Sequence, residues 1–212
     1  MPVDLFARTA ANRRLAADLL ASLTDEQWTT PSLCAGWTVR DLAGHLLMPL
    51  ELSFGAFLLR LVRERGSFDR TADRVSRELA RRATTEIVTT LREKADRRVA
   101  PPGLGPAGPF TDTCVHLRDA ARPLGSAVSP PLADWRAVLD FLVSPRARRG
   151  FVRAGRLTGL RWQADDQEWG HGDGELVTGP SEAVAMAVAG RPAALPDLRG
   201  PGVAALADRL GR

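Results

Sequence analysis

Apolar residues recur at helical spacing from the N-terminus to about residue 143, beginning with Leu15, Leu19 and Leu20. The pattern predicts helices over residues 4–23, 38–65, 69–98, 111–124 and 132–143. Pro49 lies near the middle of the second helix and is expected to kink it. Stretches with Pro and Gly at 24–36 and 99–109 predict connections. The first four helices favour an antiparallel bundle with a site in its interior.

A capping pattern marks the start of the second helix. Thr38 is suited to the N-cap, and Asp41, three residues later, completes a variant of the capping box. Trp37 precedes the cap and can act as its hydrophobic staple. We therefore expect a well-defined helix start two turns before His45.

The pattern changes after Gly155. Short apolar runs at 157–162 and 175–177 predict strands around a Gly- and Asp-rich turn at 165–174, and helices are expected at 181–189 and 202–210. We expect one domain over residues 1–150 and a small α+β region over 151–212. The predicted fold class is mainly α, a four-helix bundle with a small α+β C-terminal element.

The composition limits the classes of partner. The formal net charge is +4, but the arginines are interleaved with acidic residues and Lys94 is the only lysine. This favours solvated helix faces over a nucleic-acid surface, and the absence of Tyr weakens base stacking. No signal peptide is evident, and no apolar stretch reaches the roughly 20 residues that cross a bilayer. We expect a cytoplasmic protein with no nucleic-acid or membrane partner; the pattern leaves the oligomeric state open.

Two of the three histidines lie within predicted helices. His116 follows Asp112 by one helical turn, so both side chains project from one face. His45, from another helix, would complete a three-ligand site with an open position for substrate. A His, carboxylate, His set suits zinc, nickel or a similar divalent ion. Asp119 shares the face and can orient a ligand histidine or replace Asp112 as the third ligand. From spacing alone, a single buried histidine is more often a satisfied core residue than a ligand, so both histidines can also be core residues.

Other reactive or aromatic side chains favour structural roles. Cys34 and Cys114 are expected to be reduced, and Cys114 fits a small buried residue on the far side of its helix. Cys34 would need a nearby base or helix N-terminus to act as a nucleophile. His171, in a turn-like run, is expected to be exposed. Trp28 and Trp37 favour core anchors, with pocket lining as the alternative.

Several stretches carry a family resemblance. They are LTDEQW at 23–28, SLCAGWTVRDLAGHL at 32–46, HLRDAARPLG at 116–125, Trp-Gly at 169–170 and GRPAAL at 190–195. Together they resemble the mycothiol-dependent maleylpyruvate isomerase family of actinobacteria, within the DinB-like superfamily. The similarity covers most of the chain, and the first long motif is fairly specific.

The resemblance implies a DinB-like metal-binding helical bundle over residues 1–150. It also implies a divalent metal held by His45 and by an acid-x-x-x-His pair, here Asp112 and His116. The family often has Glu where this chain has Asp112, and the shorter side chain could alter the ligation distance or admit water. Mycothiol is the implied thiol cosubstrate.

The leading hypothesis is a metal-dependent enzyme that presents a thiolate to a small electrophile, ending in transfer or isomerisation. A second is a non-catalytic metal-dependent binding or regulatory module. A third is a structural bundle whose histidines are merely buried. The pattern does not say which electrophile is used, or which arginines would hold its carboxylate.

Overall fold

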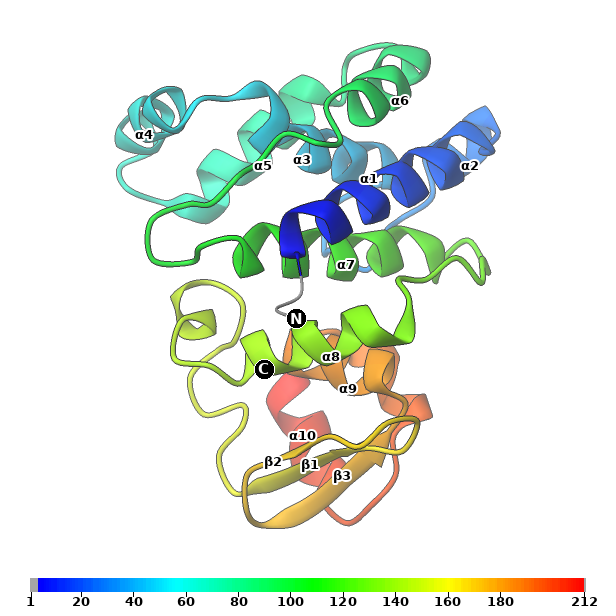
Figure 1. The fold of residues 1–212 in the computed structure, drawn as a ribbon, viewed down its shortest axis with the longest axis vertical. Helices are drawn as coiled ribbons and strands as arrows, with labels where there is room; N and C mark the ends of the chain where they lie inside the picture. Colours follow the sequence, from blue (N-terminus) through cyan, green and yellow to red (C-terminus); the bar gives the residue numbers. More distant parts are fainter. Residues whose placement is uncertain (1–3, 212) are drawn as a thin grey trace. The chain divides into compact units, whose positions relative to one another are not determined.

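The computed structural model describes residues 4–211, with the Arg149 side chain left out. The chain is mainly helical, with a small three-stranded sheet near its C-terminus, which confirms the predicted fold class (Figure 1). Packing divides it into two compact units. The helical unit comprises the described residues up to Pro101 together with His116–Ser129, and the sheet unit comprises Pro102–Val115 and the residues from Pro130 onward.

The helical unit is built around one apolar core. Its elements are α1 (Leu5–Ala21), α2 (Asp25–Trp28), α3 (Val39–Glu51), α4 (Phe54–Arg63), α5 (Phe68–Leu79), α6 (Thr84–Glu93) and the second part of α7 (Ala107–Ala121). Helix α3 packs against α5 and α6, and α1 packs against α6. The buried side chains at the centre include Leu20, Leu42, Leu47, Leu91 and Leu117, which come from α1, α3, α6 and α7.

The predicted second helix is two helices. Helix α3 ends at Glu51, and α4 begins at Phe54 after Ser53, whose Oγ accepts the N–H of Ala56 at 3.2 Å. The predicted single helix over residues 38–65 is therefore wrong, because α3 ends two residues after Pro49. Pro49 has no N–H to donate to the carbonyl four residues back, and Ser53 offers a new N-cap close by.

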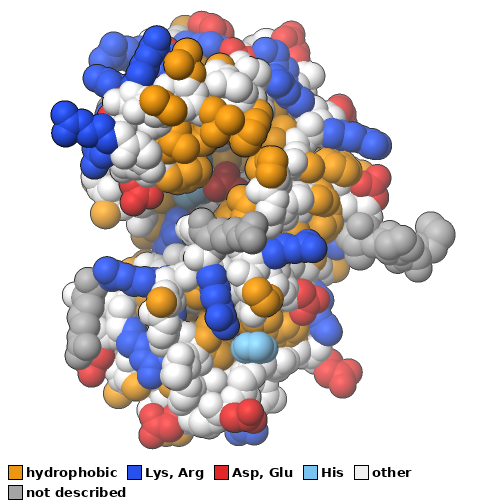
Figure 2. Space-filling model, turned by 90° about the vertical axis from the view of Figure 1, so that its left-hand side faces the viewer, with side chains coloured by type: hydrophobic (Ala, Val, Ile, Leu, Met, Phe, Trp, Pro, Cys, Tyr) orange, Lys and Arg blue, Asp and Glu red, His pale blue; other side chains and the backbone are white. Residues whose placement is uncertain are grey.

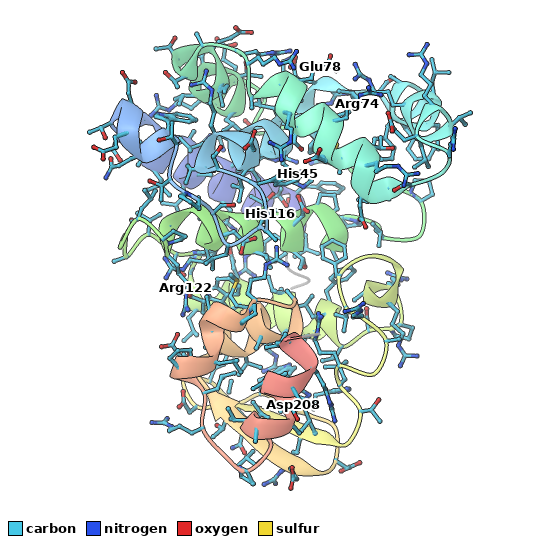
Figure 3. All side chains as sticks on the ribbon, turned by 180° about the vertical axis from the view of Figure 1, so that it is seen from behind. His45, Arg74, Glu78, His116, Arg122 and Asp208 are labelled. Carbon is cyan, nitrogen blue, oxygen red and sulfur yellow. The ribbon has the colours of Figure 1, made fainter. Side chains whose placement is uncertain are left out.

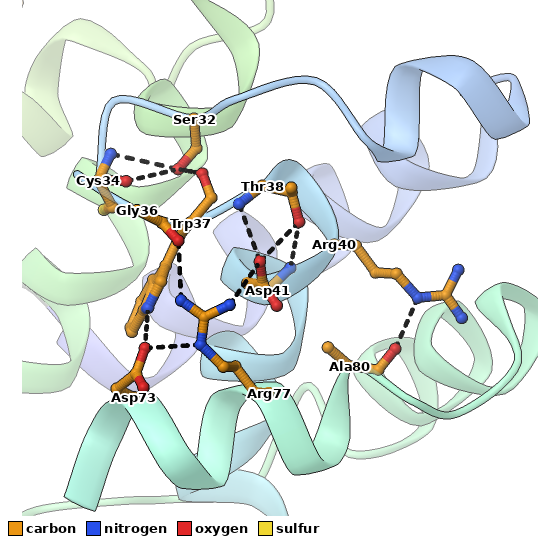
Figure 4. A network of polar contacts seen from close by, with 10 residues as sticks. All are labelled: Ser32, Cys34, Gly36, Trp37, Thr38, Arg40, Asp41, Asp73, Arg77 and Ala80. Carbon is orange, nitrogen blue, oxygen red and sulfur yellow. Dashed lines mark hydrogen bonds and ion pairs between the residues drawn. The ribbon is translucent and has the colours of Figure 1, made fainter. Parts of the chain in front are cut away.

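The predicted third helix is also broken, because α5 ends at Leu79 and α6 begins at Thr84. No Gly or Pro marks the break. Instead, Arg40 of α3 donates to the carbonyl oxygen of Ala80 at 2.6 Å (Figure 4). It also donates to the carbonyl oxygen of Arg82 at 2.7 Å. A helix end needs partners for its last carbonyls, and here a distant arginine supplies them.

Other helix predictions are confirmed, with shifted ends. The first helix is α1, and the Thr38 capping box forms, since Asp41 donates its N–H to Thr38 Oγ1 at 3.2 Å and accepts that of Thr38 at 2.9 Å. The connection at 24–36 contains the short helix α2, which sequence reasoning missed. Helix α7 begins at Ala107 because Pro109 lies in its first turn, where no N–H is needed.

The sheet unit joins helices to three short strands. Its elements after α7 are α8 (Leu132–Leu142), the 3₁₀ helix η1 (Ala147–Arg149), β1 (Leu160–Ala164), β2 (Gly170–His171), β3 (Glu175–Gly179), α9 (Ser181–Val188), the 3₁₀ helix η2 (Pro192–Asp197) and α10 (Val203–Leu210). Strand β1 lies in the middle, antiparallel to β2 and parallel to β3, with Trp162 opposite both His171 and Val177. Helix α9 packs against α8 and the two longer strands.

Strand β2 lies within the stretch predicted to be only a turn. After β2 the chain passes the start of β1 before it becomes β3. A Cβ at Gly172 would lie 2.5 Å from the Leu160 carbonyl oxygen, and one at Gly174 would lie 2.3 Å from the Gly159 oxygen. Both glycines also have positive φ. The predicted boundary near residue 150 stays a prediction, while packing groups α8 with the C-terminal elements.

Helix α4 differs from its neighbours in having no buried residue. Phe54 is 55% exposed and Val62 is 74% exposed, and Leu58 and Leu59 are also exposed. Figure 2, seen from the side on which α4 lies, shows hydrophobic side chains gathered on this part of the surface. None of the described helices is both long and apolar enough to cross a membrane.

Candidate metal site

The close crossing of α3 and α5 fixes the position of His45. A Cβ at Gly44 would lie 2.2 Å from the Ser76 carbonyl oxygen and 2.8 Å from the Ala80 nitrogen, so only glycine fits without a shift. His45 follows directly and is 6% exposed. Its Nδ1 lies 3.3 Å from Ser76 Oγ, which holds the ring against α5. Sequence reasoning did not identify Ser76, because α5 carries no spacing signal that points to His45.

His116 meets His45 from helix α7. Their ring centroids are 4.7 Å apart with an edge-to-face angle of 72°, and Figure 3 shows the two side chains next to each other. Asp112 lies one turn before His116 on the same continuous helix. One donor atom from each of the three residues lies within 4.8 Å of the other two. The structure thus brings together the three residues predicted as a ligand set.

Asp119 contacts the ring of His116 and fixes its orientation. Its Oδ2 lies 3.0 Å from His116 Nδ1, and its side chain is fully buried. With an ionised carboxylate as the acceptor, this contact fits the tautomer of the imidazole that carries its proton on Nδ1 and has its lone pair on Nε2. Asp119 groups with a different set of donors from Asp112, although the two share a helix face.

Cys34 lies beside this pair, which the sequence spacing did not indicate. Its Sγ is 3.2 Å from Asp119 Oδ2 and 3.5 Å from His116 Nδ1. The three side chains form a second group whose donor atoms lie within 4.8 Å of one another. Because 82 residues separate Cys34 from His116, only the fold reveals the contact. Both cysteines are free thiols, and Cys114 is buried as predicted.

The backbone around Cys34 is fixed by hydrogen bonds. Ser32 donates its N–H to the Trp37 carbonyl at 2.8 Å, and Ser32 Oγ accepts the N–H of Cys34 at 3.2 Å. Leu33 donates its N–H to the Asp119 carbonyl at 3.0 Å, which ties the loop to α7. The thiol therefore has a defined position beside the carboxylate.

A charged network supports the loop from α5 (Figure 4). Arg77 donates to the Gly36 carbonyl at 2.8 Å and to Asp73 Oδ1 at 2.9 Å, and it lies 3.6 Å from Asp41. Asp73 also accepts the indole N–H of Trp37 at 2.8 Å. These contacts hold the Trp37 ring in a single orientation beside the site.

The two tryptophans near the site differ in their roles. Trp28 is a core residue at 3% exposure, as expected. Trp37 is half-buried, packs against the core and has its ring centroid 5.2 Å from that of His45, so it lines the site as well. His171 is exposed on β2, as predicted.

Comparisons with known proteins concern the family and the fold of this chain. The family model described as the mycothiol maleylpyruvate isomerase N-terminal domain matches residues 9–122, more than half of the chain. Among curated proteins, none matches the sequence of this chain.

Two solved structures share the fold. One is a crystal structure of the mycothiol-dependent maleylpyruvate isomerase, 14% identical, with a TM-score of 0.55 over 95% of this chain and 93% of that one. The other is a histidine-to-alanine mutant of that enzyme, 13% identical, with the same TM-score and coverage. At this identity the likeness concerns the fold, while the family model concerns the sequence itself. On that match, the chain belongs to the mycothiol maleylpyruvate isomerase N-terminal domain family.

Proposed function

We propose that this chain is a divalent-metal-dependent enzyme that activates a low-molecular-weight thiol, mycothiol, for reaction with a small electrophile. The observation that carries the proposal is the meeting of His45, Asp112 and His116 within 4.8 Å, in a chain of this family. The proposal keeps a small thiol and a small electrophile as the partners, and a cytoplasmic location.

The donor set fits a catalytic metal. Two imidazoles and one carboxylate form a three-ligand set that leaves a position open, and zinc is the ion it suits best, with nickel as an alternative. Metal-ligating histidines usually donate their other ring N–H to a carboxylate. The contact of His116 Nδ1 with Asp119 at 3.0 Å has this form. Asp119 is therefore proposed to orient His116, with Asp112 as the third ligand.

The chemistry follows from the residues around the set. A bound divalent ion would lower the pKa of a coordinated thiol. His45 is held by Ser76, and His116 by Asp119, so both donors are positioned before a ligand arrives. The Trp37 ring packs against the His45 ring, with their centroids 5.2 Å apart. A thiolate presented here can add to an electrophile, ending in transfer or, after bond rotation, in isomerisation.

Replacing His116 tests the metal site. We expect His116→Ala to lose the divalent metal that copurifies with, or is loaded into, the wild-type chain, because both ring nitrogens are removed. His171→Ala is the matched control, since His171 is exposed on β2. Metal content would be measured by elemental mass spectrometry after dialysis. Equal metal in all three proteins, or none in any, would rule out the site.

Thiol turnover separates an enzyme from a binding module. Wild type and His45→Ala would be assayed for consumption of mycothiol with a panel of electrophiles that includes maleylpyruvate. Turnover by wild type that is lost in His45→Ala is the expected result. A metal-loaded wild type without turnover on any electrophile would instead favour the non-catalytic binding module.

A further inference from the structure

We propose that Cys34, His116 and Asp119 form a second metal position, one that contains sulfur, next to the His45, Asp112 and His116 set. The two sets share only His116. The second position does not require thiol turnover, so it stands or falls separately from the proposed catalytic function.

The distances within the Cys34 set lie within about 0.4 Å of the edges of a coordination tetrahedron. With zinc bonds of about 2.3 Å to sulfur, 2.0 Å to nitrogen and 2.1 Å to oxygen, a tetrahedral ion holds its donors roughly 3.3–3.6 Å apart. The observed separations are 3.5 Å from Sγ to Nδ1, 3.2 Å from Sγ to Oδ2 and 3.0 Å from Nδ1 to Oδ2. An ion could therefore enter with shifts of only a few tenths of an ångström.

Burial and charge suit a cation at this position. The side chain of Asp119 is fully buried, and a bound cation could take the place of the donors that His116 and Cys34 offer it. Cys34 and His116 are partly exposed, which leaves a path from solvent. All three residues belong to the helical unit, and the hydrogen bond from Leu33 to the Asp119 carbonyl fixes the thiol relative to α7.

The shared ring makes the two positions alternatives. A neutral imidazole has one nitrogen that donates and one that accepts. When Nδ1 donates to Asp119, the ring can bind a metal only through Nε2; when Nδ1 binds a metal, that hydrogen bond is given up. A thiolate selects softer ions such as cadmium over manganese or magnesium, whereas zinc accepts nitrogen, oxygen and sulfur ligands. We therefore expect cadmium to use the Cys34 set, and zinc to be accepted by either set.

Cobalt absorption tests the assignment directly. Co²⁺ bound to a thiolate gives a near-ultraviolet charge-transfer band, which nitrogen and oxygen ligands alone do not give. We expect the Co²⁺-loaded wild type to show the band, Cys34→Ala to lose it, and both Cys114→Ala and His45→Ala to keep it. Far-ultraviolet circular dichroism checks that each variant is folded.

Three outcomes overturn the proposal. They are Co²⁺ binding without the band, a band that persists in Cys34→Ala, and a band lost in His45→Ala, which would place the thiol in a single combined site. A second measurement uses the wild-type chain, so it tests the proposal even if a variant does not fold. Cd²⁺ should slow alkylation of Cys34 several-fold, read by peptide mass spectrometry with Cys114 as the internal reference. Unchanged Cys34 alkylation at saturating Cd²⁺ also contradicts the proposal.

Discussion

At the scale of single residues, the lack of a side chain at Gly44 decides where His45 stands. Glycine inside a helix costs about 1 kcal/mol relative to alanine, so its presence here needs a structural reason. The reason is the 2.2 Å separation between an added Cβ and the Ser76 carbonyl oxygen. The same residue, Ser76, contacts His45 through its hydroxyl. Helix packing and placement of the candidate ligand therefore depend on one contact.

We expect Gly44→Ala to lower the free energy of unfolding by roughly 1–3 kcal/mol, because the added methyl group must push α3 away from α5. Metal affinity should fall with it, since His45 moves. Gly55→Ala is the control, because nothing lies within 4 Å of its added Cβ in α4 and it should be neutral or stabilising by up to about 1 kcal/mol. Urea denaturation measures both. Similar midpoints for the two variants would show that the crossing adapts.

The residue scale also shows how far sequence reasoning reaches. The one-turn spacing of Asp112 and His116 is visible in the sequence, because a helix fixes it. The meeting of His116 with His45 was a hypothesis that needed the fold. Cys34 beside Asp119 could not be predicted, since the two are 85 residues apart and lie on a loop and a helix with no shared period.

At the scale of elements, ion pairs join the end of α3 to the residues that flank α6 on either side. Glu51, the last residue of α3, contacts Arg82 at 2.8 Å and also pairs with Lys94. The hydrogen bond from Lys94, together with that from Arg82, lowers the pKa of Glu51 below its ordinary value of 4.5. These charges link α3 to both ends of α6.

The lowered pKa gives a prediction with a defined sign. A carboxyl group with a depressed folded-state pKa stabilises the fold above its unfolded pKa, and this contribution disappears as the pH falls through the folded value. Glu51→Gln should therefore cost about 0.2–1 kcal/mol near neutral pH and almost nothing in acid. The exposed Glu93→Gln serves as control. Thermal unfolding across pH measures the difference, and a gap that persists in acid would contradict the ion-pair explanation.

Two helix breaks set the limit of prediction at this scale. The helix break after Glu51 has a partial signal in the sequence, because Pro49 and Ser53 lie beside it. We predicted only a kink at Pro49 from this pattern. The interruption between α5 and α6 has none, because the carbonyl partners come from Arg40 on another helix. Propensity describes neighbours along the chain, so it missed a break made by a tertiary contact.

At the scale of the whole molecule, the likeness to solved structures reaches further than the family model. The family model ends at residue 122, whereas the structural match covers 95% of the chain. The sheet unit thus belongs to a shared fold, although the candidate ligand set depends on α3 and α7. Alternation of apolar runs and glycines was enough to predict the two longer strands, but not β2, which is only two residues long.

Metal binding should stabilise the whole chain by mass action. An ion present at 100 times its dissociation constant adds about 2.7 kcal/mol to the free energy of unfolding when only the folded state binds it. Wild type should show this gain with Zn²⁺ and lose it with a chelator. His116→Ala should show neither, because its ring serves both candidate sets. Differential scanning calorimetry gives the comparison, and an equal gain in wild type and variant would mean that zinc binds elsewhere.

The passage of the chain around the start of β1 has a consequence for how the sheet forms. Parallel strands usually need a crossover of a dozen or more residues, most often a helix. Here β1 and β3 are joined by residues 165–174, which include β2, and Gly172 and Gly174 allow the tight return. Loop-closure entropy grows with the length of the closed loop, and folding is faster when contacting residues are near in sequence. The only parallel pairing in the described sheet is thus a low-contact-order pairing, available early in folding without waiting for distant segments.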